Sequence, residues 1–262
     1  MDNIHFGNEN MLAIGICSAL MVIMPVTVFV IWKVKTHSKI KPVFVGAVTF
    51  LLFAIVLKLP FAYLLYQSGS PVSEAINSNP WLYYLFGGLL AGLFEESGRF
   101  IAFKTVMKNN KQKTDAVTYG IGHGGIESIY IGLSLLSFIA IGVMINSGNT
   151  SQLTEGAAPE QIEALKDQLA QYASFDITGV FTGVLERASA MLIHISLSML
   201  VFEAANSRKR LWLYLCAVLT HFVFDFIIVF TKFGLPLIAL EIIFVVFSVT
   251  TFIIAKKAVN RL

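Results

Sequence analysis

Seven long apolar runs dominate this sequence, and each is close to the length of a membrane-spanning helix. A hydrocarbon core about 30 Å thick needs about 20 apolar residues per helical span. The chain is 56% hydrophobic and 13% charged, whereas soluble domains are roughly one-quarter charged. The sequence therefore predicts an all-α polytopic membrane protein, a single membrane domain over residues 1–262. About seven transmembrane helices are expected near 11–32, 43–66, 81–103, 114–145, 180–202, 211–231 and 236–255.

The loops between these runs differ in their content of lysine and arginine. Basic residues are concentrated at 33–41, 104–113, 207–210 and 256–262. The N-terminal segment and the loop 67–80 contain no Lys or Arg, and the long segment 146–179 contains only Lys166. Because positively charged loops stay on the cytoplasmic side, we expect the N-terminus outside and the C-terminus in the cytoplasm. The segment 146–179 is then an extracytoplasmic loop.

Within this outer loop, the stretch "APEQIEALKDQLAQYA" has the pattern of a short amphipathic helix. Pro159 suits its first turn. Ile162, Leu165, Leu169 and Tyr172 recur at helical spacing and form one apolar stripe. The helix is expected either to cap the outer surface or to act as a lid that admits substrate.

Net charge and cysteine content exclude some other classes of protein. The formal net charge of +3 is small and scattered, so no nucleic-acid partner is expected. The expected partner is the lipid bilayer. Cys17 and Cys216 lie within apolar runs without CxxC spacing, which indicates small core residues rather than a metal or redox site.

Ionisable residues interrupt four of the predicted spans, where each is costly and therefore marks a candidate functional site. Counted from the flanking basic residues at 1.5 Å per residue, Glu95 lies roughly 13 Å, His123 roughly 15 Å, His221 roughly 16 Å and His194 roughly 21 Å from the cytoplasmic end. Acids and imidazoles of four helices thus reach nearly the same depth. This agreement predicts one shared, water-accessible site near the middle of the membrane.

Spacing within each helix suggests partners for these groups. Glu95 and Arg99 are four residues apart and are expected to form an ion pair. His123 with Glu127, and His221 with Asp225, repeat this spacing, so each acid is expected to orient its imidazole or to serve as a further ligand. Outside the predicted site, Glu186 and Arg187 are expected to pair with each other or to face water. Lys58 and Glu203 are interpreted as interfacial or snorkelling groups.

This combination of residues suits peptide hydrolysis within a membrane. A buried glutamate can take a proton from water, and imidazoles can stabilise the developing oxyanion or hold a metal ion that does so. Signatures of other intramembrane proteases are missing from the sequence, which has no HExxH, GxSG or GxGD motif.

Four motifs in order resemble those of the YhfC-type intramembrane peptidases, within the superfamily of CAAX prenyl endopeptidases and bacteriocin-processing enzymes. They are "EESGR" in the third span, "GHGGIE" in the fourth, "ERASAMLIH" in the fifth and "HFVFD" in the sixth. The resemblance implies a multi-pass intramembrane endopeptidase of the bacterial plasma membrane, acting on a membrane-associated peptide or protein. It also implies a site made of Glu95, Glu96, His123, His194, His221 and Asp225, supported by Arg99 and Glu127.

The resemblance leaves several points open. By position, Glu95 resembles the family's catalytic glutamate, with Glu96 beside it, and the base is Glu95 or Glu96. The role of Arg99 is also open, because "EESGR" has one residue fewer between the glutamates and the arginine than the broader superfamily. His123, His194 and His221 are expected either to bind a metal, with zinc as the candidate, or to act without metal as oxyanion stabilisers. A catalytically silent scaffold of the same fold and a proton-coupled transporter are the alternative functions. The sequence does not indicate the substrate or the oligomeric state.

Overall fold

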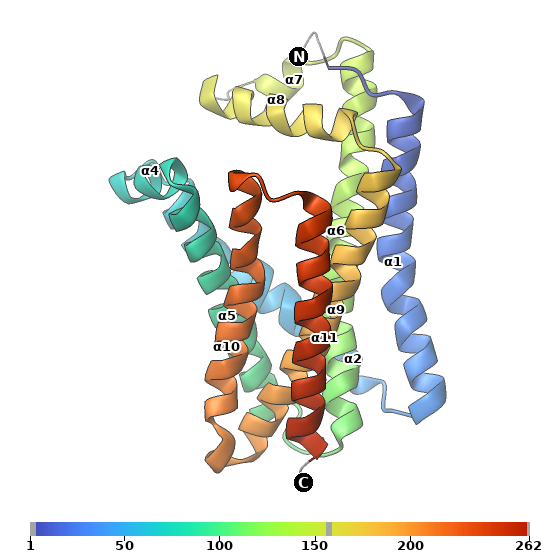
Figure 1. Ribbon diagram of the computed structural model, residues 1–262, viewed down its shortest axis with the longest axis vertical. Helices are drawn as coiled ribbons and strands as arrows, with labels where there is room; N and C mark the ends of the chain where they lie inside the picture. Colours follow the sequence, from blue (N-terminus) through green and yellow to red (C-terminus); the bar gives the residue numbers. More distant parts are fainter. Residues whose placement is uncertain (1–3, 156–158, 261–262) are drawn as a thin grey trace. The chain divides into compact units, whose positions relative to one another are not determined.

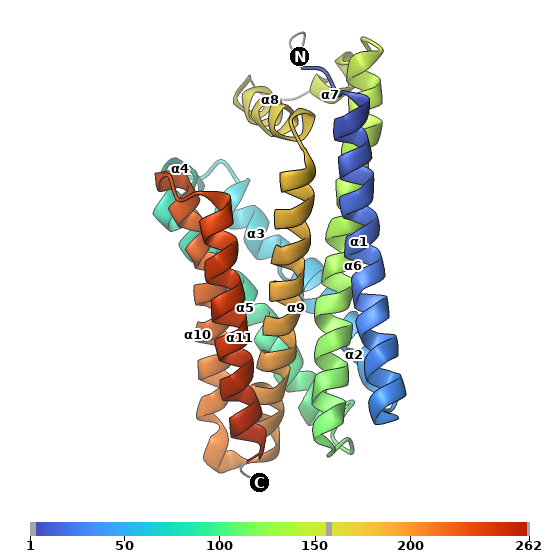
Figure 2. The same ribbon diagram turned by 45° about the vertical axis from the view of Figure 1, so that its right-hand side comes forward.

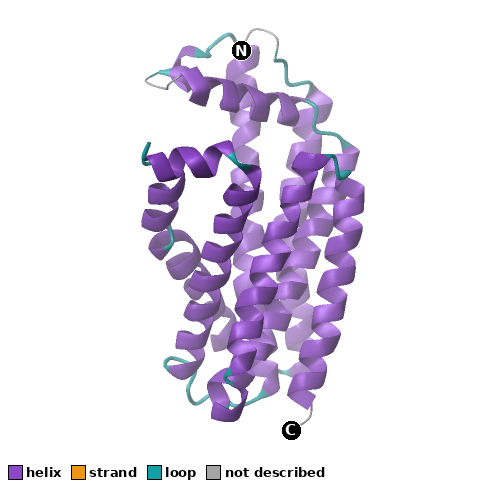
Figure 3. Ribbon diagram, turned by 60° about the vertical axis from the view of Figure 1, so that its left-hand side comes forward, coloured by secondary structure: helices purple, strands orange, loops and turns teal. Residues whose placement is uncertain are grey.

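The computed structural model describes residues 4–155 and 159–260, and every regular element in these two ranges is a helix (Figure 3). Short connections join most consecutive helices. The helices and their bounds are α1 (Asn8–Thr36), α2 (Lys41–Phe50), the π-helix η1 (Leu51–Leu57), α3 (Leu59–Tyr66), α4 (Pro71–Ser78), α5 (Pro80–Lys104), α6 (Lys113–Asn146), α7 (Ser151–Thr154), α8 (Pro159–Ala173), α9 (Ile177–Asn206), the 3-10 helix η2 (Arg208–Arg210), α10 (Trp212–Phe226), the 3-10 helix η3 (Ile227–Phe233) and α11 (Leu237–Asn260).

The described residues contain six helical segments that are long and apolar enough to cross a membrane. They are Asn8–Thr36, Lys41–Tyr66, Lys113–Asn146, Ile177–Asn206, Arg208–Phe233 and Leu237–Val259. The protein is therefore an all-α polytopic membrane protein, as predicted. The remaining predicted span coincides with α5, whose 25 residues reach roughly 37 Å but include Glu95, Glu96 and Arg99. The seventh span and the orientation of the termini stay predictions.

The chain divides into two compact units, and the division falls within α1, α6 and α9. The first unit comprises the described residues of Met1–Met24 and Ser128–Arg187. Its core includes Ile14 and Cys17 of α1, which are fully buried. The helix α8 runs crosswise to α6 in Figure 1, with Leu169 fully buried and Tyr172 stacked on Phe138 of α6. Whether α8 caps the surface or gates it stays open.

The second unit comprises Pro25–Glu127 and the described residues of Ala188–Leu262. Its part of α9 is almost entirely buried, so this helix is the centre against which others pack. In Figure 1, α5 runs beside α10. Close approach of these two helices requires Gly88 and Gly92, because a Cβ at either position would meet a backbone oxygen of α10 at 2.9 or 2.7 Å. Gly88 and Gly92 thus form a small-residue contact of the kind that lets membrane helices approach closely.

The chain from α2 to α3 runs obliquely to the long axis of α9 (Figure 2). The π-helix η1 interrupts the segment between the two α-helices. π-helical turns are rare in proteins, and those that do occur are often found at functional sites. Because the segment is oblique, a count of about 1.5 Å per residue overestimates how deep its residues, Lys58 among them, lie along the axis of α9.

Candidate active site

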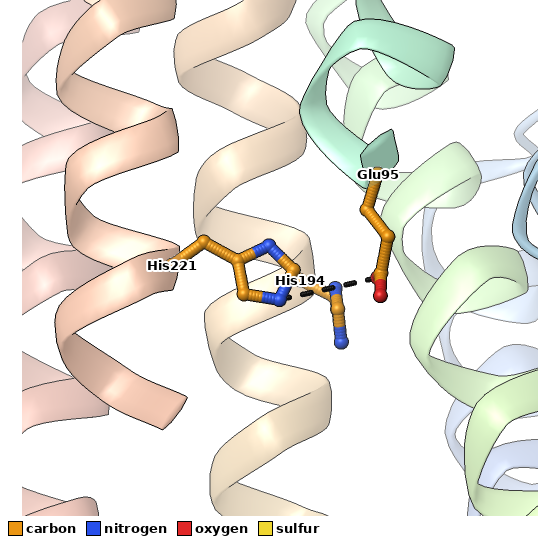
Figure 4. A group of neighbouring side chains, drawn as sticks. All are labelled: Glu95, His194 and His221. Atoms are coloured by element: carbon orange, nitrogen blue, oxygen red, sulfur yellow. Dashed lines mark ion pairs between the residues drawn. The ribbon is translucent and has the colours of Figure 1, made fainter. Parts of the chain in front are cut away.

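The acids and imidazoles predicted to share a site do lie together, all in the second unit. Glu95 and Glu96 come from α5, His123 from α6, His194 from α9, and His221 with Asp225 from α10. The ring centroids of His123 and His194 are 4.9 Å apart, and those of His194 and His221 are 5.3 Å apart. Figure 4 shows Glu95, His194 and His221 converging from three helices.

The two adjacent glutamates have different partners, because consecutive residues of an α-helix point about 100° apart. Glu95 Oε2 lies 3.1 Å from His123 Nε2 on α6. Glu96 Oε1 lies 2.8 Å from His221 Nδ1 on α10. The pair therefore connects α5 to two neighbouring helices at one level.

Glu96 is held by Arg99, whose Nη1 donates to both carboxylate oxygens at 2.6 Å. Both side chains are fully buried. The predicted pair of Glu95 with Arg99 is therefore wrong. Residues three and four apart share a helix face equally, so spacing alone could not choose between the two glutamates.

Arg99 also fixes the protonation pattern of His194. Its Nη2 lies 3.0 Å from His194 Nδ1, and because arginine only donates hydrogen bonds, this ring nitrogen must accept. The neutral ring then carries its proton on Nε2, which lies 2.5 Å from Glu127 Oε2. Glu127 thus orients His194 on another helix, not His123 on its own helix as predicted.

His221 has the opposite arrangement. Its Nδ1 faces a carboxylate that can only accept, so the proton of the neutral ring lies on Nδ1. The lone pair of Nε2 is then directed to a space between Glu95 Oε2 at 3.9 Å and Asp225 Oδ2 at 3.7 Å. His221 and Asp225 lie near each other as predicted, but 3.7 Å is longer than a hydrogen bond, and the orienting role of Asp225 stays a prediction.

His123 is the most enclosed of the three imidazoles and is 0% exposed. The Phe50 ring meets it edge-on with 5.4 Å between centroids. Its Nε2 hydrogen bond to Glu95 is the polar contact that it makes with the site, and Nδ1 has no hydrogen-bond partner among the described residues. This imidazole is placed to orient Glu95.

Lys58 is a member of the cluster that sequence analysis missed. Its Nζ lies 3.6 Å from Glu95 Oε1. The sequence alone predicts an interfacial or snorkelling group at this position. A residue count from Lys41 puts Lys58 roughly 26 Å along its span, well beyond the other groups. A signal was present in the sequence, since Lys58 is the sole charged residue between Lys41 and Glu74.

The cluster has a closed centre and a more open rim. The side chains of Glu95 and His221 are 6% and 5% exposed. Those of Lys58, Glu127 and Asp225 are 26%, 19% and 34% exposed. Water and a peptide would therefore reach Glu95 past these three charged groups.

Three of these residues could hold a metal ion. Ligand atoms of Glu95, His194 and His221 all lie within 4.8 Å of one another. Two imidazoles and a carboxylate, with an open fourth position for water, form a donor set of catalytic zinc sites. The set differs from the three predicted histidines, because Glu95 takes the place of His123. The carboxylate of Glu96 on the other nitrogen of His221 is the outer contact that metal-binding imidazoles usually have.

The remaining charged residues near the predicted spans have partners of their own. Glu186 pairs with Arg187 at 2.5 Å in the first unit, as expected. Glu203 pairs with Arg210 at 3.1 Å. Ser97 contacts Tyr214 at 2.8 Å, so it is not placed as a serine nucleophile beside His123.

Fold and cluster together define a multi-pass membrane protein with a buried glutamate–histidine centre. Comparison with known proteins identifies it further. The chain belongs to the YhfC intramembrane metalloprotease family, whose sequence profile matches residues 20–248. It is also 33% identical over 219 residues to the uncharacterized membrane protein YhfC of Bacillus subtilis (strain 168), covering 83% of each chain. No solved structure matches it. The predicted membership of this family is confirmed.

Proposed function

We propose that this protein is an intramembrane endopeptidase that hydrolyses a peptide bond of a membrane-associated protein or peptide, with Glu95 as the general base. The observation that carries the proposal is the unequal use of two adjacent glutamates. Both oxygens of Glu96 bind Arg99 and one also binds His221. Glu95 instead bonds to His123 through Oε2 and lies beside Lys58 and the lone pair of His221.

In this reaction, Glu95 takes a proton from water while the water oxygen forms a bond to the scissile carbonyl carbon. The carbonyl electron pair moves to its oxygen and gives a tetrahedral oxyanion. Collapse of this intermediate breaks the C–N bond, and the proton held by Glu95 passes to the departing amine. The products are a carboxylic acid and an amine, and Glu95 is again ionised, so atoms and charges balance.

The other residues hold these groups in position. Glu96 and Arg99 fix His221 and His194 through their Nδ1 atoms, and Glu127 fixes His194 through the opposite nitrogen. His123 orients the Glu95 carboxylate. We infer that His194 and His221 stabilise the oxyanion from Nε2. For His221 this requires the protonated ring, in which Nε2 carries a hydrogen and faces Asp225.

Glu95, His194 and His221 would also hold zinc, which supplies Lewis-acid polarisation of a carbonyl and acidification of bound water. For His194, metal binding through Nε2 requires a change in its contacts, because Arg99 donates to Nδ1 and the proton therefore lies on Nε2. Glu95 is required with or without the metal, so the Glu95→Gln variant does not distinguish metal-dependent from metal-free hydrolysis. Elemental analysis of the purified protein does.

The test uses purified protein in proteoliposomes with fluorescein-labelled single-span peptides that have Leu/Ala-rich cores of varied sequence. Wild type is expected to cleave members of this set, and Glu95→Gln to lose about 10²-fold or more of the rate. Glu186→Gln is the matched control, a glutamate of α9 that pairs outside the cluster, and should cleave as wild type. Cleavage unaffected by Glu95→Gln would overturn the role of Glu95 as general base, and no cleavage by wild type across the set would favour a catalytically silent scaffold.

A further inference from the structure

A lysine in the second apolar run, Lys58, is brought to the rim of the cluster, beside Glu95, by an unusual piece of backbone. The π-helix η1 ends at Leu57, and the backbone N–H of Lys58 donates to the carbonyl of Phe53, five residues earlier. Pro60 follows in the first turn of α3. Because proline has no N–H, it cannot supply the hydrogen bond that a continuous helix would need there. The change of helix type thus occurs directly before the lysine.

The packing of η1 on α5 sets the position of Lys58. Gly98 of α5 faces the ring of Phe53, whose Cγ lies 2.5 Å from where a Cβ would be, so only glycine permits this contact. Gly98 and Glu95 are three residues apart on one face of α5. Phe53 and Lys58 are five apart, which is the hydrogen-bonding interval of a π-helix. One turn of each helix therefore pairs Phe53 with Gly98 and Lys58 with Glu95.

The charge of Lys58 has a specific partner. The guanidinium of Arg99 contacts Glu96 and His194. Over the described ranges, the ammonium of Lys58 is the one Lys or Arg group within 4.0 Å of the Glu95 carboxylate. It contacts Oε1, whereas Oε2 faces His123 and His221. The two oxygens of Glu95 thus have separate partners.

We propose that Lys58 is a positioning residue of the active site, holding Oε1 of Glu95 so that Oε2 points to the imidazoles and the incoming water. Its role in turnover rests on the proposed function, whereas its pairing with Glu95 does not. A lysine that merely snorkels to the membrane surface would have no energetic coupling to Glu95. The pairing and the catalytic role can therefore be tested separately.

The pairing is tested by a double-mutant cycle of Lys58→Met and Glu95→Gln, with thermal unfolding of the purified protein as the readout. Lys58→Met leaves an uncompensated carboxylate in the membrane and should lower Tm by about 3 °C or more. In the Glu95→Gln background, the same substitution should have less than half this effect. Additive shifts would overturn the pairing. Lys41→Met, which removes a lysine from the same span, should behave additively with Glu95→Gln.

The catalytic role is tested on the peptide that wild type cleaves fastest. Lys58→Met should lower kcat about tenfold or more while KM changes by less than about twofold, because the substrate still binds but Glu95 is misplaced. Lys58→Arg keeps the charge and should recover most of kcat. A loss in kcat not recovered by Arg, or unchanged kcat in Lys58→Met, would overturn the positioning role. If wild type cleaves nothing, the proposed function fails, and the Tm cycle still decides the pairing.

Discussion

Arg99 is the residue whose replacement tests the architecture of the cluster most directly. Its guanidinium is fully buried and bonds to Glu96 twice and to His194 once. In Arg99→Met, the Glu96 carboxylate is left buried without its cation. Removing one partner of a buried ion pair costs about 3–5 kcal/mol, a large share of a total stability of about 5–15 kcal/mol.

For a chain of this size, 1 kcal/mol shifts Tm by about 2–4 °C. Arg99→Met should therefore lower Tm by about 6–20 °C. The double variant Glu96→Gln with Arg99→Met removes the charge that was left unpaired, and the amide oxygen of the new glutamine would still accept from His221 Nδ1. We expect it to regain at least half of the loss. Recovery is incomplete because His194 Nδ1 remains without its donor, at about 1–3 kcal/mol for a buried polar atom.

The assay is the fraction of monodisperse protein in detergent after heating, followed by size-exclusion fluorescence. Arg208→Met is the matched control, since Arg208 is exposed and surface changes usually stay within about 0.5 kcal/mol. If Arg99→Met unfolds at the wild-type temperature, the buried pair is not a determinant of stability. If the double variant is less stable than Arg99→Met, the account of an unpaired carboxylate is refuted.

Two further predictions concern the metal and the helix packing. Elemental analysis of the purified protein should find about one zinc ion per chain. The zinc should be lost in His221→Ala and kept in the control His5→Ala. Wild type that cleaves peptide with no metal would contradict this prediction. Gly122→Ala places a Cβ against the backbone of Val43 and should destabilise by about 1–3 kcal/mol. Gly87→Ala meets only the Tyr66 hydroxyl at 3.4 Å and should change stability by less than about 0.5 kcal/mol; equal Tm values would refute the packing argument.

The sequence predicted the helices and the membership of the cluster for clear physical reasons. Apolar length determines which segments can span a membrane, and ionisable groups at that depth are rare enough to stand out. The depth of Glu95, His123 and His221 could be counted from basic residues because their helices are regular. The same count misplaces Lys58, since η1 and the oblique course of its segment (Figure 2) break the assumption of a straight α-helix.

The partners within the cluster were less predictable than its members. Spacing within a helix identifies groups that share a face, but the contacts here join residues 28, 95 and 125 positions apart in the sequence. Arg99 pairs with Glu96 rather than Glu95, and Glu127 pairs with His194 rather than His123. Such choices depend on how α5, α6, α9 and α10 are rotated about their axes, which a single sequence does not encode in any local pattern.

The charges of the completed cluster bear on how it works. It contains four carboxylates, on Glu95, Glu96, Glu127 and Asp225, but the cations Arg99 and Lys58 balance only two of them. With neutral imidazoles and ionised acids, two negative charges remain, and a membrane interior strongly disfavours uncompensated charge. A divalent cation between Glu95 and His221 would balance them, and so would protons taken up by the imidazoles and acids. Metal-dependent and metal-free hydrolysis are therefore two ways of meeting one electrostatic requirement, and both place the compensating charge beside the carboxylate proposed to activate water.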